Sequence, residues 1–222
     1  MIKLVIFDWN GTLFADAKVC LEAHNHALKK LGVKPISLGR FRETFTVPLT
    51  NLFVANGAKK EKVLSNPELI AKTFHDFYEP RIKRTRTRHG SKKILKWLDE
   101  NEIKIVILSN HVKDKISDQL KRLKIDYYFQ EVLANNQTST AYKTNPKRER
   151  LEKFMGLNKL TSDQVILVGD ALEEIEIGRD IGVKSVAITG GFCSTRRLKA
   201  AKPDYLISDL GQIINIVRKI NS

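Results

Sequence analysis

Two aspartates in this chain each follow an apolar stretch of the kind that forms a buried strand. Asp8 follows the run 3–7, and Asp170 follows the run 165–168 after one glycine. The carboxyl ends of parallel strands form the ligand-binding edge of an open α/β sheet, so the two carboxylates are expected at one edge. A carboxylate in such a place can act as a nucleophile or hold a divalent cation.

Two further segments supply groups that bind phosphate. Ser109 ends the apolar run 103–108, and Lys143 comes just before a stretch with helical spacing. A hydroxyl and an ammonium group can hold phosphate oxygens while the carboxylates hold a cation. Taken together, the four segments predict a phosphate site.

These segments, in this order, resemble the haloacid dehalogenase-like (HAD) hydrolase superfamily, from Met1 to roughly Leu206. The first motif of that superfamily, Asp-x-Asp-Gly-Thr-Leu, is similar to Asp8-Trp9-Asn10-Gly11-Thr12-Leu13. The other three motifs are matched by Ser109-Asn110, by Lys143 with Pro146 three residues on, and by Gly169-Asp170 with Glu174. Each motif alone is common by chance, but four in order are specific.

The resemblance implies a role for each of these residues. Asp8 would attack phosphorus and form an aspartyl-phosphate, and Mg²⁺ would bind the Asp8 and Asp170 carboxylates and the backbone carbonyl of Asn10. Glu174 would reach the metal through water, or bind Lys143 instead. The implied groups are Asp8, Asn10 and Lys143 for catalysis, Thr12, Ser109, Asn110 and Lys143 for phosphate, and Asp8, Asn10, Asp170 and Glu174 for the metal.

Two neighbours of these residues compete with them for a role. Lys147 lies four residues after Lys143, and Lys143 is preferred because Pro146 then falls where the family places it. Glu173 precedes Glu174 and is expected to face solvent.

Asn10 is the departure from the family pattern. In the phosphatase branches this position carries a second aspartate, which protonates the leaving oxygen, and an amide cannot transfer a proton in this way. The resemblance therefore implies a Mg²⁺-dependent phosphohydrolase, similar in layout to phosphoglycolate phosphatases, whose turnover on a small phosphorylated metabolite is slow. Two alternatives stay open: a non-enzymatic HAD-fold protein that binds phosphate or polyanions, and a phosphonate-cleaving HAD enzyme, which would need a lysine in the inserted segment.

Apolar runs alternate with helical patterns along most of the chain, which predicts an α/β fold with a parallel, Rossmann-like sheet covered on both faces. The expected strands are 2–7, 103–108, 131–134, 165–168, 183–188 and a short one near 205–207, and the expected helices are 91–101, 112–123, 146–155 and 173–181.

The long gap between the first two strands has helical spacing only. Asn66-Pro67-Glu68 is a strong helix start. We therefore expect a core domain over 1–15 and 86–222, and an inserted all-helical domain over 16–85. In the family resemblance this insertion is a cap of the C1 type over the active site, and Phe45 and Val47 either line its pocket or fill its core.

Chain length, the absence of a long apolar run and the cysteine content limit the possible class and location of the protein. The chain has 222 residues, enough for one domain with an insertion, and contains no apolar run near the roughly 18 residues of a membrane span. Its start reads as a strand rather than a signal peptide, and its two cysteines, Cys20 and Cys193, have no metal-type spacing. These features predict free thiols, a cytoplasmic location and no membrane partner, and they leave the oligomeric state open.

The formal net charge of +14 is high for an enzyme of small metabolites. The densest basic run extends from Arg81 to Lys93 without an acidic residue. It predicts either a solvated linker or a polyanion-binding patch, and nucleic acid is not favoured because no aromatic residue is interleaved with the charges. The five histidines show no ligand spacing, although His111 is expected near the rim of the pocket.

Overall fold

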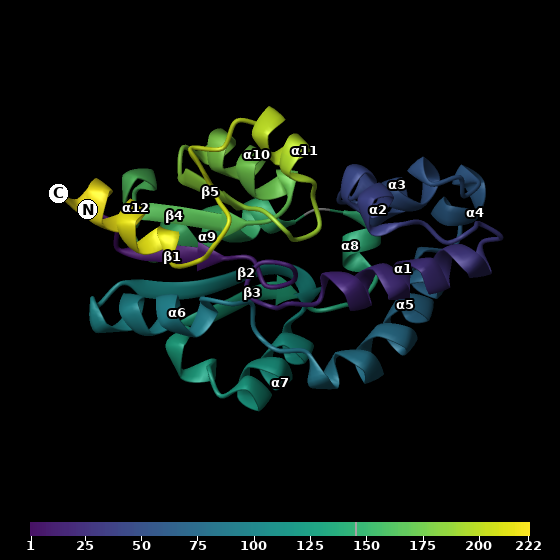
Figure 1. Ribbon diagram of the computed structural model, residues 1–222, viewed down its shortest axis with the longest axis horizontal. Helices are drawn as coiled ribbons and strands as arrows, with labels where there is room; N and C mark the ends of the chain where they lie inside the picture. Colours follow the sequence, from purple (N-terminus) through teal and green to yellow (C-terminus); the bar gives the residue numbers. More distant parts are fainter. Residues whose placement is uncertain (145) are drawn as a thin grey trace.

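A six-stranded parallel sheet forms the centre of the molecule. The computed structural model describes residues 1–144 and 146–222 (Figure 1). The strands are β1 (Leu4–Phe7), β2 (Lys104–Val112), β3 (Glu131–Asn135), β4 (Val165–Gly169), β5 (Lys184–Ile188) and β6 (Tyr205–Ile207). Their order across the sheet is β3-β2-β1-β4-β5-β6, and every neighbouring pair is parallel. The predicted α/β fold is confirmed, and β1 and β4, which carry the two aspartates, are neighbours.

Side chains of β1 enter the hydrophobic core on both faces of the sheet. Leu4 and Ile6 belong to a cluster that includes α9 (Lys147–Leu157), whereas Val5 and Phe7 belong to a larger cluster that includes α6 (Ser91–Glu100) and α12 (Gln212–Asn221). Both faces are therefore buried, which explains why the strands appear in the sequence as continuous apolar runs. The remaining elements of the core are α7 (Lys113–Leu123), α8 (Thr140–Lys143), α10 (Leu172–Ile181), α11 (Thr195–Ala200) and the 3-10 turns η1 (Ile82–Arg84), η2 (Asp126–Tyr128) and η3 (Ser162–Gln164).

Five helices follow β1 and lie beyond the carboxyl ends of the strands, at the right of Figure 1, while both termini lie at the opposite end. We call these helices the cap: α1 (Ala17–Lys30), α2 (Leu38–Thr44), α3 (Leu49–Ala55), α4 (Lys60–Leu64) and α5 (Pro67–Arg81). The helix start at Pro67 is confirmed, and α1 packs against α5. The division into domains at 16–85 stays a prediction.

The two chain segments that connect the cap to the core pair with each other. Phe14 forms an antiparallel bridge with Thr87, and the amide of Ala15 donates to the carbonyl of Arg86. The guanidinium of Arg88 donates to the carbonyls of Gly11 (2.6 Å) and Thr189 (2.7 Å). Part of the basic run therefore has a structural role, because Arg88 ties the loop after β1 to the loop after β5.

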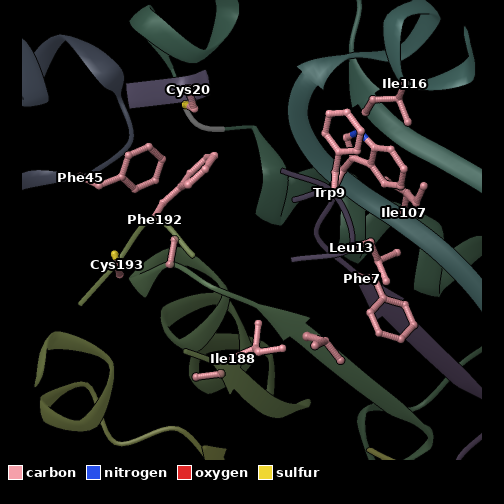
Figure 2. Packing of buried hydrophobic residues seen from close by; sticks show 14 of the residues in the cluster. Phe7, Trp9, Leu13, Cys20, Phe45, Ile107, Ile116, Ile188, Phe192 and Cys193 are labelled. Carbon is pink, nitrogen blue, oxygen red and sulfur yellow. The ribbon is translucent and has the colours of Figure 1, made fainter. Parts of the chain in front are cut away.

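Aromatic rings continue the core from the sheet into the cap. Phe45 follows α2, and its ring lies 4.8 Å from that of Phe192, which belongs to the core (Figure 2). Phe41 of α2 contacts the same ring at 5.7 Å between centroids. In the part of the chain that the structure describes, no helix is long and apolar enough to cross a membrane. Both cysteines are buried and free.

Candidate active site

The edge of the sheet brings Asp8 and Asp170 together, as their positions in the sequence predict. Asp8 follows β1, and its amide donates to Val168 of β4 (2.8 Å). The Asp170 carboxylate accepts hydrogen bonds from the Thr12 hydroxyl (2.8 Å) and from the amide of Phe192 (2.5 Å). Both carboxylates are buried, and Asp170 is fixed in orientation.

Two glycines allow the backbone to approach Asp170 closely. A Cβ on Gly191 would lie 2.0 Å from the Asp170 carboxylate, and one on Gly11 would lie 2.3 Å from it. Gly11 also has a φ of +77°, a backbone conformation that residues with a side chain rarely adopt. Glycine is needed at both positions to enclose this carboxylate.

The lysine of the site is Lys147, and the preference for Lys143 is corrected. The Lys147 ammonium lies 2.8 Å from Oδ1 of Asp8, contacts Glu174 and is 3.8 Å from Glu173. Lys143 is half exposed at the end of α8, where its ammonium pairs with Glu68 of the cap. The two side chains point in different directions because Lys143 ends α8 and Lys147 begins α9.

Both glutamates after Asp170 are buried, so the expectation that Glu173 faces solvent is wrong. Glu173 accepts a hydrogen bond from the side-chain amide of Asn110 (2.7 Å). Glu174 binds Lys147 and also accepts from the amide of Ala171 (3.2 Å) at the start of α10. The longer side chain of Glu174 therefore binds the lysine, one of the two roles expected for it, although the lysine is Lys147 instead of Lys143.

The residues of the second motif lie in the pocket. Ser109 and Asn110 fall where the register between β2 and β3 shifts, and both line the pocket. Thr12 also contacts the second aspartate. Its fully buried hydroxyl donates to Asp170 and positions that carboxylate, and phosphate binding by Thr12 stays a prediction.

Burial and like charge raise the pKa values of the two aspartates. Removal from water raises the pKa of Asp170 to about 7, and Glu174 adds to the rise. The pKa of Asp8 is also raised by burial, against the attraction of Lys147, and by Glu174 and Asp170. Burial disfavours the charge on Lys147, but Asp8 and Glu174 outweigh this effect and raise its pKa. Carboxylates outnumber the ammonium group here, and a divalent cation with oxygen ligands suits this donor set.

Asn10 belongs to a hydrogen-bonded group that the sequence did not indicate. Its side-chain amide donates to Oδ2 of Asp16 (2.8 Å) and to the hydroxyl of Tyr78 (2.9 Å), and that hydroxyl donates to the same Asp16 oxygen (2.5 Å). Burial raises the pKa of Asp16 to about 6, although these hydrogen bonds favour its charged form. Asn10 thus links the loop after β1 to cap helix α5.

The pocket lies between the sheet edge and the cap. Asp8, Asp170, Ser109 and Lys147 line it from the core. The cap contributes Phe45 and Val47, so Phe45 both packs in the core and faces the pocket. The lining combines an acidic base that contains one lysine with the apolar side chains of Phe45 and Val47, as is common in small-ligand sites.

Fold and site together define an α/β protein with a parallel sheet and an acidic, lysine-containing centre under a helical cap. Residues 5–188 match the sequence profile of the haloacid dehalogenase-like hydrolases, and the chain belongs to this family. The resemblance inferred from the four motifs is confirmed.

Named relatives and solved structures extend this result. The chain is 28% identical over 219 residues to a candidate pyrophosphatase, PpaX, of Caldanaerobacter subterraneus subsp. tengcongensis, covering 98% of this chain and 95% of that protein. It is 25% identical to a phosphoglycolate phosphatase of Pseudomonas fluorescens, covering 96% of this chain and 78% of that protein. The crystal structure of a predicted phosphatase from Clostridium acetobutylicum superposes with a TM-score of 0.84 at 18% identity, covering 99% of both chains. The expectation of a HAD-type hydrolase is confirmed, and the curated relatives are named as phosphatases.

Proposed function

We propose that this protein is a Mg²⁺-dependent phosphohydrolase that acts on a small phosphorylated metabolite. The observation that carries the proposal is the position of Asp8. Its carboxylate ends the central strand, lines the pocket and pairs with Lys147 beside a second fixed carboxylate, Asp170. Attack by Asp8 on phosphorus would form an aspartyl-phosphate and break the P–O ester bond, and the leaving oxygen would take its proton from water because Asn10 has none to give. A second water would then hydrolyse the aspartyl-phosphate and release phosphate.

The metal would be held by Asp8, Asp170 and the backbone carbonyl of Asn10. The close glycine contacts around Asp170 and the excess of carboxylates over cationic groups fit a divalent cation. When bound, the ion supplies positive charge that lets an anionic phosphate approach an anionic carboxylate.

The chain's own residues would then hold the phosphate. Lys147 is charged next to Asp8 and offsets the repulsion between the nucleophile and the phosphate oxygens. Ser109 lines the pocket, and its hydroxyl would donate to a phosphate oxygen. Lys147 thus takes the part that the family resemblance gave to Lys143.

Three observations support a small substrate. The curated relatives are named for pyrophosphate and phosphoglycolate, the pocket is roofed by Phe45 and Val47 of the cap, and Arg88 of the basic run is used internally.

Free, buried cysteines fit the reducing conditions of the cytoplasm.

A phosphonate-cleaving activity is not favoured. Among the described residues that line the pocket, Lys147 is the single lysine and belongs to the core. A non-enzymatic, phosphate-binding protein is the second candidate, because Asn10 lacks the proton of the usual aspartate and is tied to Asp16 and Tyr78.

Turnover of a panel of phosphate esters and pyrophosphate with Mg²⁺ separates the two candidates. We expect Mg²⁺-dependent hydrolysis of at least one ester, complete loss in Asp8→Asn, and full activity in the control Asp180→Asn, which removes a surface carboxylate. Phosphate binding without turnover on any ester would favour the second candidate. Turnover retained in Asp8→Asn would exclude the aspartyl-phosphate mechanism.

A further inference from the structure

Two histidines and a glutamate meet where cap helix α5 touches the core. His75 and Glu79 lie one turn apart on α5, and Nδ1 of His75 is 3.1 Å from Oε1 of Glu79. His111 comes from β2 in the core, and its Nε2 lies 3.5 Å from the same oxygen. One ligand atom from each of the three residues lies within 4.8 Å of the others.

The two separations from Glu79 match the edges of a metal coordination polyhedron, and the two histidine nitrogens lie within 4.8 Å of each other. Zinc binds histidine nitrogen at 2.0–2.1 Å and carboxylate oxygen at 2.0–2.2 Å, so two of its ligands in a tetrahedron lie about 3.3 Å apart. The two separations from Glu79 bracket this value. Two imidazoles and one glutamate also form a ligand set found in zinc enzymes.

His111 has an unused nitrogen directed at this cluster. Its side chain is only 7% exposed, and Nε2 has no hydrogen-bond partner among the described residues because its contact with Glu79 lacks hydrogen-bond geometry. Burial lowers the pKa of His111 to about 4, so the ring is neutral at pH 7 and one nitrogen carries a free electron pair. Burial disfavours the charge on Glu79, but the hydrogen bond from His75 and the charge of His111 when protonated keep its pKa below the usual value.

We propose that His75, Glu79 and His111 form a binding site for a transition-metal ion such as Zn²⁺, which joins the cap to the core. The site is chemically distinct from the Asp8–Asp170 centre, because nitrogen ligands select transition metals whereas an all-oxygen set suits Mg²⁺. His75 and His111 also line the pocket, so an ion held by these three side chains would be next to the ligand space.

A bound ion would hold the cap closed, because its ligands come from both sides of the interface. The same interface carries the contact of Tyr78 with Asn10 and Asp16, and the Tyr78 ring packs edge-on against His111. The alternative is that the three side chains only pack together, as a histidine–carboxylate pair with a stacked second ring. A measurement of metal binding distinguishes a metal site from such packing.

The test is a titration of tag-free, metal-stripped protein with Zn²⁺ by calorimetry and with Co²⁺ by visible absorption, in excess Mg²⁺. We expect one site per chain. His75→Gln and His111→Gln should each lower the affinity at least about tenfold, since even residues that only orient metal ligands contribute about 10- to 100-fold. His89→Gln is the matched control, because His89 pairs with Asp209 at the surface.

A second control separates this site from the catalytic centre. The double variant Asp8→Asn with Asp170→Asn should bind Zn²⁺ as tightly as the parent protein. Circular dichroism checks that each variant folds, and Glu79→Gln, at a partly exposed position, replaces His111→Gln if the latter does not. Absence of binding by the parent protein, unchanged affinity in the His75 and His111 variants, or loss of binding in the aspartate double variant would each overturn the proposal.

Discussion

Replacement of Asn10 by aspartate should destabilise the protein more at high pH than at low pH, and should supply the proton carrier that the site lacks. Nδ2 of Asn10 donates to Oδ2 of Asp16 at 2.8 Å. In Asn10→Asp this donor becomes an acceptor, and two carboxylates face each other. At this distance and an effective dielectric constant of about 20, two full charges repel by about 6 kcal/mol.

Protonation of one carboxyl group is the less costly response. The pKa of Asp16 is about 6 because it is buried, so keeping its proton at pH 8 costs about 2.7 kcal/mol. The destabilisation of the variant relative to the parent should therefore reach about 3 kcal/mol at pH 8. It should fall below about 1 kcal/mol at pH 5, where Asp16 already carries a proton in the folded state. Because folding raises the pKa of Asp16, its protonated form stabilises the protein at low pH, and this stabilisation is lost as pH rises through the pKa of the folded state. In the variant, the second carboxylate raises that pKa further, so the loss continues to higher pH.

Urea unfolding at pH 5 and pH 8 measures this effect. The control is the exchange of both side chains, Asn10→Asp with Asp16→Asn, which keeps one carboxylate and one amide and should remove most of the pH-dependent loss. Equal destabilisation of the single variant at both pH values, or the same pH-dependent loss in the exchanged variant, would refute the reasoning.

The same variant tests catalysis. General acid–base groups contribute about 10²- to 10⁴-fold to rate, so turnover of an alkyl phosphate should rise by a factor in that range. The gain should be smaller with p-nitrophenyl phosphate, whose leaving group needs little protonation. If neither ester is hydrolysed faster, Asn10 does not limit turnover.

Three further predictions follow from the site and the fold. Lys147→Gln should lower turnover by about 10²- to 10³-fold because it removes the buried ammonium beside Asp8. Lys143→Gln should change turnover by no more than about twofold. A larger loss in the Lys143 variant would restore the assignment made from the sequence. Burial lowers the pKa of His24 to about 4, so its neutral ring contributes stability that is complete above about pH 6.5 and is lost as pH falls from there toward 4, by at most about 3 kcal/mol. Urea unfolding at pH 7 and 4.5 should show a smaller drop in His24→Leu than in the parent, and an equal drop would contradict this assignment. Charge reversal at Arg84 and Arg86 should abolish any nucleic-acid binding seen at low salt, with Arg88 left intact because it bonds to Gly11 and Thr189; a tight complex that persists at physiological salt would contradict a small-molecule substrate.

The sheet was readable from the sequence because both its faces are covered. Every residue of β1 and of β4 is buried, so each appears as an unbroken apolar run. The aspartates that follow them could be placed at one edge by the general geometry of parallel sheets. The helices α8, α11 and α12 were not expected, although the alternation of strands and helices predicted the rest of the core.

The site was easiest to predict where a residue lies at or near the carboxyl end of a strand, as Asp8, Ser109 and Asp170 do. Lys143 and Lys147 are one helical turn apart in sequence, and the direction of each depends on the change from α8 to α9. Asp16 joins the site because the chain at 14–15 pairs with 86–87, a contact between distant segments. The spacing of His75 and Glu79 on one helix was visible in the sequence, but their contact with His111 depends on how the cap lies on the core.

The aromatic contact between cap and core has a thermal consequence. Phe45 packs against Phe192 across this interface (Figure 2), and Phe41 contacts the same ring. The guanidinium of Arg42 donates to the carbonyls of Gly190 and Gly191 beside it. Opening of the cap would expose these rings to water, and exposure of apolar surface raises the heat capacity. The logarithm of the equilibrium constant between closed and open cap would then depend non-linearly on inverse temperature. Substrate affinity coupled to closure would therefore give a curved van 't Hoff plot. Admission of substrate would be governed by the hydration of three phenyl rings as well as by the charges beneath them.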